Sequence, residues 1–171
     1  MELYLEHQTD KTKEIHFFNN FKEFETIVEQ ENIDLDDWSM WYPNDAEDLY
    51  TLLFDGFTIV VDELEDFYKL IEYYDEDDLL KVAMYLDCHA GNIDILTFDV
   101  DNIIDSINYF ECDSLYEVAQ ELYDEGSYEE VPSWLEDKMD KVYELIQEDL
   151  EYNWHDIKIG LSTYFYECVD K

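Results

Sequence analysis

The strongest constraint on this chain is its imbalance of charge. Its 171 residues include 47 aspartates and glutamates against nine lysines, with no arginine, and the net charge is −38. Strongly acidic chains are often disordered, because they bury too little apolar surface to offset chain entropy. Here the hydrophobic fraction is 47%, the aromatic fraction is 17%, and there are four glycines and two prolines. We therefore expect a folded protein whose apolar core offsets strong self-repulsion.

The spacing of apolar residues predicts an α+β protein with a helix-rich middle and short antiparallel strands at both ends. Strands are expected at residues 2–6 and 13–18, and one or two more over 157–168. Helices are expected after Asn20, where Glu23 completes a capping box, and in several later segments. These later helices cover residues 62–74, 79–86, 99–107, 113–125 and 132–151.

Other segments carry weaker signals. Residues 34–44 are predicted to be irregular, with three aromatic side chains around Pro43. Asp45 is expected to cap a short helix, and Gly91 to end a longer one. Residues 57–61 and 93–98 are each predicted to be extended. We divide the chain into residues 1–56 (N-terminal α+β), 57–98 (central helical) and 99–171 (C-terminal α+β).

The acids are concentrated in stretches without cations. Residues 23–68 and 82–137 contain no lysine. Glu117, Glu121 and Glu125 follow one another at one-turn spacing, where like charges lie about 5–6 Å apart and disfavour an isolated helix. Folding does not require this arrangement. The alternatives that need no function are a solvated acidic face and a halophilic surface.

Motifs for catalysis or cofactor binding are missing from the sequence. The four histidines form no metal-ligand pattern, and there is no glycine-rich phosphate loop. Cys88, Cys112 and Cys168 are widely spaced, without a CxxC motif. Asp99 and Asp101 begin an EF-hand-like pattern that fails at Ile104, where glycine is needed. We expect no enzyme activity, no cofactor and no metal site, and a soluble, cytoplasmic protein without a signal peptide or membrane span.

Part of the chain resembles a known family. The segments SLYEVAQELYDEG (114–126) and VPSWLEDKMD (131–140), followed by Glu148, Asp149 and Leu150, resemble the ArdA antirestriction proteins, and the looser similarity covers residues 57–167. The resemblance implies an elongated protein of small subdomains in series that acts as a DNA mimic. It also implies a homodimer whose acids occupy the DNA-binding groove of type I restriction-modification enzymes.

Charge and resemblance together predict a non-enzymatic DNA mimic. A net charge of −38 matches that of about 65 Å of duplex, or roughly 19 base pairs. The expected partners are DNA-binding subunits of a host restriction-modification or CRISPR enzyme, with no direct binding to nucleic acid or membrane. The acids expected to replace DNA phosphates are Glu63, Glu65, Asp66, Asp75, Asp77, Asp78, Glu117, Glu121, Asp124, Glu125, Glu129 and Glu130.

Three alternatives to a restriction-enzyme inhibitor remain open at this point, the first of them within the same class of DNA mimics. An anti-CRISPR mimic would use the same acids against a Cas effector instead of a restriction enzyme. An acidic interaction module would instead bind one small basic protein. A calcium-dependent protein is a third possibility, which a thermal melt with calcium would test.

Overall fold

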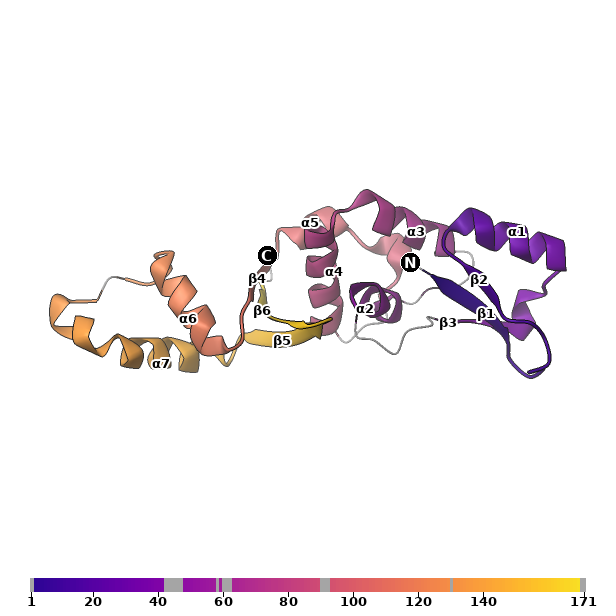
Figure 1. The fold of residues 1–171 in the computed structure, drawn as a ribbon. Helices are drawn as coiled ribbons and strands as arrows, with labels where there is room; N and C mark the ends of the chain where they lie inside the picture. The colour runs from indigo at the N-terminus through magenta and orange to yellow at the C-terminus, as the bar shows by residue number, and fades with distance from the viewer. Residues whose placement is uncertain are drawn as a thin grey trace.

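The computed structural model describes residues 2–41, 48–57, 59, 63–89, 93–129 and 131–169, without the side chain of Glu136. These residues form an elongated α+β molecule (Figure 1). One three-stranded antiparallel sheet comes from the N-terminal part of the chain and another from the C-terminal part, with helices between them. The predicted fold class is therefore confirmed.

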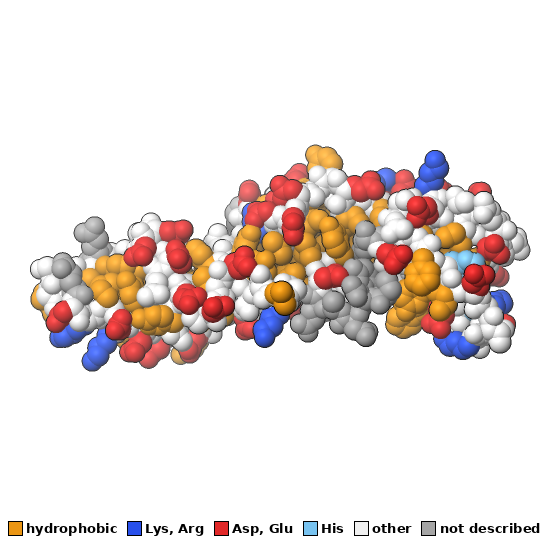
Figure 2. All heavy atoms as spheres, in the orientation of Figure 1, with side chains coloured by type: hydrophobic (Ala, Val, Ile, Leu, Met, Phe, Trp, Pro, Cys, Tyr) orange, Lys and Arg blue, Asp and Glu red, His pale blue; other side chains and the backbone are white. Residues whose placement is uncertain are grey.

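The N-terminal sheet has the strand order β2-β1-β3, from β1 (Leu3–His7), β2 (His16–Phe18) and β3 (Trp38–Trp41). Alternation along β1 places Leu3 and Leu5 in the core and Tyr4 on the opposite face. Helix α1 (Phe21–Glu31) begins at Asn20, whose side chain accepts a hydrogen bond from the Glu23 amide. Figure 2 shows hydrophobic side chains gathered over this sheet.

The prediction of an irregular segment at 34–44 is wrong for its described part. Residues Leu35–Asp37 form a 3₁₀ turn, and β3 follows, because Trp41 and Met40 pair with Tyr4 and Leu5 of β1. The pairing is a tertiary contact that local propensity does not reveal. The rest of that segment and the predicted Asp45 cap lie outside the described residues. The described cap of the next helix is Asp48, whose carboxylate accepts from the Thr51 amide.

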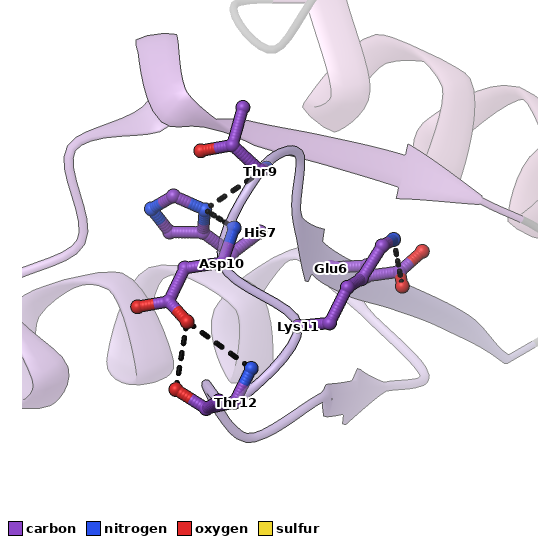
Figure 3. Close-up of polar contacts among 6 residues, drawn as sticks. All are labelled: Glu6, His7, Thr9, Asp10, Lys11 and Thr12. Carbon is purple, nitrogen blue, oxygen red and sulfur yellow. Dashed lines mark hydrogen bonds and ion pairs between the residues drawn. The ribbon is translucent and has the colours of Figure 1, made fainter.

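Polar contacts order the turn between β1 and β2 (Figure 3). The Nδ1 atom of His7 accepts hydrogen bonds from the amides of Thr9 and Asp10, at 3.3 and 3.0 Å. Asp10 accepts from both the amide and the hydroxyl of Thr12, and these bonds lower the pKa of the Asp10 carboxyl. Lys11 forms an ion pair with Glu6. The acids of this turn therefore serve local structure.

The middle of the chain contains α2 (Leu49–Gly56), α3 (Leu64–Tyr73), α4 (Glu76–Cys88), the 3₁₀ turn η3 (Ile95–Thr97) and α5 (Val100–Ile104). The predicted strand at 93–98 is wrong, because Ile93 forms a single bridge to Phe57 and a 3₁₀ turn follows. Most of the predicted 57–61 strand, and Gly91, lie outside the described residues. Gly56 allows α2 to approach α4, since an added Cβ would lie 2.9 Å from Leu86.

The C-terminal part contains β4 (Ile107–Glu111), α6 (Leu115–Asp124), the 3₁₀ turn η4 (Ser133–Lys138), α7 (Met139–Leu150), β5 (Trp154–Ile159) and β6 (Ser162–Cys168). The strand order is β4-β6-β5. The helix predicted to begin at Pro132 starts as the 3₁₀ turn and becomes α-helical at Met139. Gly126 follows α6 with φ of +83°, a conformation that favours glycine.

Three apolar cores lie along the molecule and are joined by shared elements. Leu64 and Tyr68 of α3 belong to the N-terminal core, whereas Phe67 and Leu70 of the same helix belong to the central core. The C-terminal sheet is shared in the same way. Its residues Ile107, Ile157 and Tyr166 join the central core, and Phe110, Trp154 and Phe165 join the core of α6 and α7. The division at residues 56/57 and 98/99 stays a prediction.

The helices in the described part of the chain are all too short or too polar to traverse a lipid bilayer.

Candidate functional site

The candidate site is the acidic surface. Across the described ranges, every carboxylate is exposed or partly exposed, and His7 is the one buried ionisable side chain other than tyrosine. Figure 2 shows Asp and Glu side chains distributed along the full length of the visible face, with few lysines among them. The fold therefore keeps its negative charge in contact with solvent, as the cost of burying unpaired charge requires.

Lysine neutralises few of these acids. In the part of the chain that the structure describes, the ion pairs are Lys11–Glu6, Lys69–Glu65, Lys69–Asp66 and Lys81–Asp77. The side chains of Lys69 and Glu65 are 61% and 50% exposed, so solvent screens their attraction. The acid excess seen in the composition is therefore also an excess on the folded surface.

The predicted site residues fall into two groups that lie apart along the molecule. Glu63 precedes α3, Glu65 and Asp66 lie in its first turn, and Asp75, Asp77 and Asp78 lie at the start of α4. The second group is on or just after α6, and comprises Glu117, Glu121, Asp124, Glu125 and Glu129. Glu130 lies outside the described residues. Figure 1 places α6 towards one end of the molecule and α3 and α4 nearer its middle.

Several acids of the first group are already used by the fold. Asp75 is the N-cap of α4, and its carboxylate accepts from the Asp78 amide at 3.1 Å. Asp77 accepts from Lys81 and from the hydroxyl of Tyr109 on β4, and these two hydrogen bonds lower the pKa of the Asp77 carboxyl. Asp77 therefore links α4 to the C-terminal sheet.

The start of α4 also carries repulsion that Lys81 offsets only in part. The pKa of Asp78 is raised, first by partial desolvation and then by the neighbouring carboxylate of Asp75, with smaller effects from Asp77 and Asp101. Asp101, in the first turn of α5, accepts a hydrogen bond from the Tyr74 hydroxyl at 3.1 Å. Burial, followed by this bond, raises the pKa of Tyr74. Acids from α4 and α5 therefore meet beside Tyr74.

The acids of α6 are less engaged. Glu117 accepts from the Asp113 amide at 2.9 Å, while Ser114 caps the helix, so these residues form a capping arrangement. By contrast, Glu121, Asp124 and Glu125 make neither a side-chain hydrogen bond nor an ion pair within the described residues. Their charge is available to an external cation.

A third acidic row, on α7, was missed by the sequence analysis. Asp140, Glu144 and Glu148 follow at four-residue spacing and are exposed. This spacing, the same as that used for Glu117 and Glu121, was visible in the sequence. In the structure, Asp140 accepts a hydrogen bond from Tyr116 of α6 at 3.4 Å. Desolvation, and then the charges of Asp140 and Glu144, raise the pKa of Tyr116.

Tyrosines connect the two acidic helices. The ring of Tyr143 on α7 lies 5.8 Å from those of both Tyr116 and Tyr123 on α6. Desolvation and the carboxylate of Asp124 raise the pKa of Tyr143. Val118, Ala119, Ile146 and Leu150 fill the core between the helices. We call α6 and α7, with their acids, the acidic helix pair.

The density of acids on α6 is close to that of a DNA strand. Glu117 and Glu125 are separated by about 12 Å along the helix axis, given a rise of ~1.5 Å per residue. Glu121 and Asp124 lie between them, so the row holds four charges at intervals that average about 4 Å along the axis. A strand of duplex DNA carries one phosphate per ~3.4 Å. The helix can therefore present a comparable linear charge to a basic groove.

Other reactive side chains form no recognisable centre. The ring of His89 stacks on Tyr85 at 3.9 Å, and its Nδ1 atom lies 2.9 Å from the Tyr85 carbonyl oxygen, so neighbouring Cys88 is not its partner. Burial, followed by the charges of Glu117 and Glu121, raises the pKa of Cys112 and disfavours its thiolate. No group of three or more metal-ligating side chains in the described ranges is placed to hold an ion.

The chain is thus an acidic, elongated α+β protein whose surface charge is its main chemical feature. Comparisons with protein-family models, with curated proteins and with solved structures find no match to it. The resemblance to the ArdA family therefore stays a prediction from the sequence.

Proposed function

We propose that this protein is a non-enzymatic DNA mimic that occupies the DNA-binding site of a host defence enzyme in the cytoplasm of a bacterial cell. A type I restriction-modification enzyme is the favoured target. The observation that carries the proposal is the acidic helix pair, in which rows of carboxylates lie on helices packed against each other and have no lysine partners within the described residues.

The mechanism is competitive. Lysines and arginines that position DNA contact its phosphates, and the carboxylates of α6 and α7 offer them equivalent acceptors. These acids are fixed on helices that pack through Val118 and Ile146, so few backbone degrees of freedom are lost on binding. Association is steered by the net charge of −38 and weakens as salt screens it.

The central acids are proposed as a second part of the same interface. Glu63, Glu65, Asp66, Asp75 and Asp78 lie around the starts of α3 and α4, in the middle of the elongated molecule. An extended inhibitor could contact a DNA channel at both places. The possible homodimer stays a proposal from the family resemblance.

Binding to a purified type I restriction enzyme, measured across a salt series with DNA as competitor, tests the proposal. We expect DNA to displace the protein, and the logarithm of the dissociation constant to rise linearly with that of the salt concentration. Binding that DNA leaves unchanged would contradict mimicry. Binding to a Cas effector alone would support the anti-CRISPR alternative, and capture of one small basic protein would support an acidic interaction module.

A matched pair of variants tests the location of the interface. The first replaces Glu117, Glu121, Glu125, Asp140, Glu144 and Glu148 by Gln or Asn. The control replaces six exposed acids near the N-terminus: Glu2, Glu14, Glu25, Glu29, Asp36 and Asp37. Both remove the same charge. We expect the first to weaken binding by at least 100-fold at low salt and the control by less than tenfold; equal losses would mean that net charge, and not the helix pair, drives binding.

A further inference from the structure

An apolar groove lies beside the central acids. It has a volume of about 560 Å³ and lies between α3 and the η3–α5 segment. Leu70, Ile95 and Val100 form its apolar lining, and Tyr73 and Tyr74 form its aromatic side. Cavities of about 300–1,000 Å³ with apolar walls and few polar groups are typical of binding sites. Phosphate mimicry needs no such groove.

Tyr73 gives the groove an exposed aromatic surface. Its side chain is 81% exposed, and its ring meets that of Tyr74 edge-on, with centroids 4.9 Å apart. Large aromatic side chains are usually buried, and an exposed tyrosine beside an apolar groove is typical of a binding hot spot. The π face of such a ring attracts cations.

Acids surround this aromatic surface. Glu72 lines the groove and makes neither an ion pair nor a side-chain hydrogen bond in the described part of the chain. Asp101 lies within hydrogen-bonding distance of Tyr74, and Asp78 and Asp75 lie close enough to each other for their charges to interact. Asp66 and Lys69 also line the groove, and the Lys69 ammonium is paired with Glu65 and Asp66. A cation in the groove would pair with Glu72, the one acid of the lining that has no lysine partner within the described residues.

We propose that this groove binds an arginine side chain presented by the partner protein. Arginine matches it because its aliphatic stem packs on apolar surface, its planar guanidinium stacks on aromatic rings, and its charge pairs with carboxylates. Lysine, a strongly hydrated point charge, matches the aromatic surface less well. A second copy of this chain is not the occupant, because the chain contains no arginine.

This inference rests on the proposed function for the identity of the partner, but the groove can be tested without it. Tri-arginine and tri-lysine peptides of equal charge are titrated into protein labelled with ¹³C in its tyrosine rings. The Tyr73 signal is assigned with Tyr73→Phe, which retains the aromatic face. We expect the Tyr73 resonance to shift, with a dissociation constant at least threefold lower for tri-arginine.

Two variants locate this preference. Tyr73→Ala removes the exposed ring, and Tyr152→Ala removes a tyrosine that is 86% exposed just after α7, outside the groove. Because substitutions at Tyr73 remove its own resonance, binding to the variants is followed through the ring of Tyr74, which also lines the groove. We expect Tyr73→Ala to abolish the preference for arginine, and Tyr73→Phe and Tyr152→Ala to retain it. Equal affinity for both peptides, or a preference that survives in Tyr73→Ala, would overturn the proposal.

Binding of the same variant to the restriction enzyme is a second test of the groove. Tyr73→Ala should raise the dissociation constant about tenfold without changing its salt dependence, because no charge is removed. If the wild-type protein binds both peptides equally but still binds the enzyme, the groove is rejected and the proposed function stands. If the protein prefers tri-arginine but does not bind the enzyme, the groove is supported and the proposed function is rejected.

Discussion

The acids of the central helices α3 and α4 and those of the acidic helix pair have the same chemistry but different roles. In the centre, Asp75 caps a helix, Asp77 bonds Lys81 and Tyr109, and Asp87 accepts a hydrogen bond from Tyr166 at 2.6 Å. On α6 and α7, Glu121, Glu125, Glu144 and Glu148 have no such partner among the described residues. Asp75, Asp77 and Asp87 therefore stabilise the fold, whereas Glu121, Glu125, Glu144 and Glu148 oppose it by repulsion.

This difference separates the acids that stability explains from those that need a functional explanation. A carboxylate that completes a cap or bonds a tyrosine is explained by stability alone. A row of unpaired carboxylates one turn apart reduces helix stability, so its presence favours a function outside the fold. The comparison can be tested by neutralising acids of each group and measuring stability.

The largest effect is expected at Asp87. Tyr166 is fully buried, and its hydroxyl donates to the Asp87 Oδ2 atom. Asp87→Ala leaves this hydroxyl without its partner, which costs about 1–3 kcal/mol of unfolding free energy. Chemical denaturation measures the loss. Tyr166→Phe is the control, because it removes the buried hydroxyl together with the hydrogen bond and leaves no buried donor without a partner. A larger loss of stability in Tyr166→Phe than in Asp87→Ala would contradict this explanation.

A smaller effect of opposite sign is expected on the helix pair. Combining Glu121→Gln, Glu125→Gln, Glu144→Gln and Glu148→Gln removes four one-turn repulsions, two on each helix, at about 0.2–0.5 kcal/mol each. The protein should become about 1–2 kcal/mol more stable at low ionic strength. Thermal melts in 10 mM and 1 M salt measure this, and the gain should vanish at 1 M, where the Debye length is ~3 Å. A destabilised variant would show that these acids serve the fold.

The smallest expected changes in stability are those of substitutions at Asp77 and Asp78, which should differ in their pH dependence. The pKa of Asp77 is lowered by Lys81 and Tyr109, so its stabilisation is present above the unfolded pKa and is lost as pH falls through the folded one. Asp77→Asn should therefore reduce stability at pH 7, by about 0.5 kcal/mol for such an exposed pair, and have no effect at strongly acidic pH.

Asp78 should behave in the opposite way. Its pKa is raised by desolvation and by Asp75, so its charged form is disfavoured in the folded state. Asp78→Asn should slightly stabilise the protein at pH 7, and this gain should disappear as pH falls below the ordinary aspartate pKa of 3.8. Melting temperatures between pH 2.5 and 7 would show both trends; parallel curves for the two variants would refute the assignment.

The accuracy of the sequence predictions depended on whether the signal was local. Helix α6 was predicted well because Ser114 caps it and Gly126 follows it, and both are local signals. Strand β3 was missed because its pairing partner, β1, is distant in sequence. The 3₁₀ turn η3 was predicted as a strand because Ile95 and Leu96 are apolar. A short apolar run occurs in strands and in 3₁₀ turns alike, so it does not distinguish between them.

The candidate site was predicted in part. The acids of α6 and those at the starts of α3 and α4 were identified from composition and spacing. The sequence could not show that Asp77 bonds Tyr109, or that Asp87 bonds Tyr166, because these partners lie 32 and 79 residues apart. It also could not show the groove beside Tyr73, which requires α3 and η3 to come together.

The sequence by itself determined the net charge, the aromatic composition that permits folding, and the local caps and periodicities that predict most helices. Tertiary structure alone decided which acids are bonded within the fold and which remain available on the surface. The reason is physical: charge and helix propensity belong to individual residues and their near neighbours, whereas ion pairs, buried hydroxyl partners and grooves depend on distances between segments far apart in the chain.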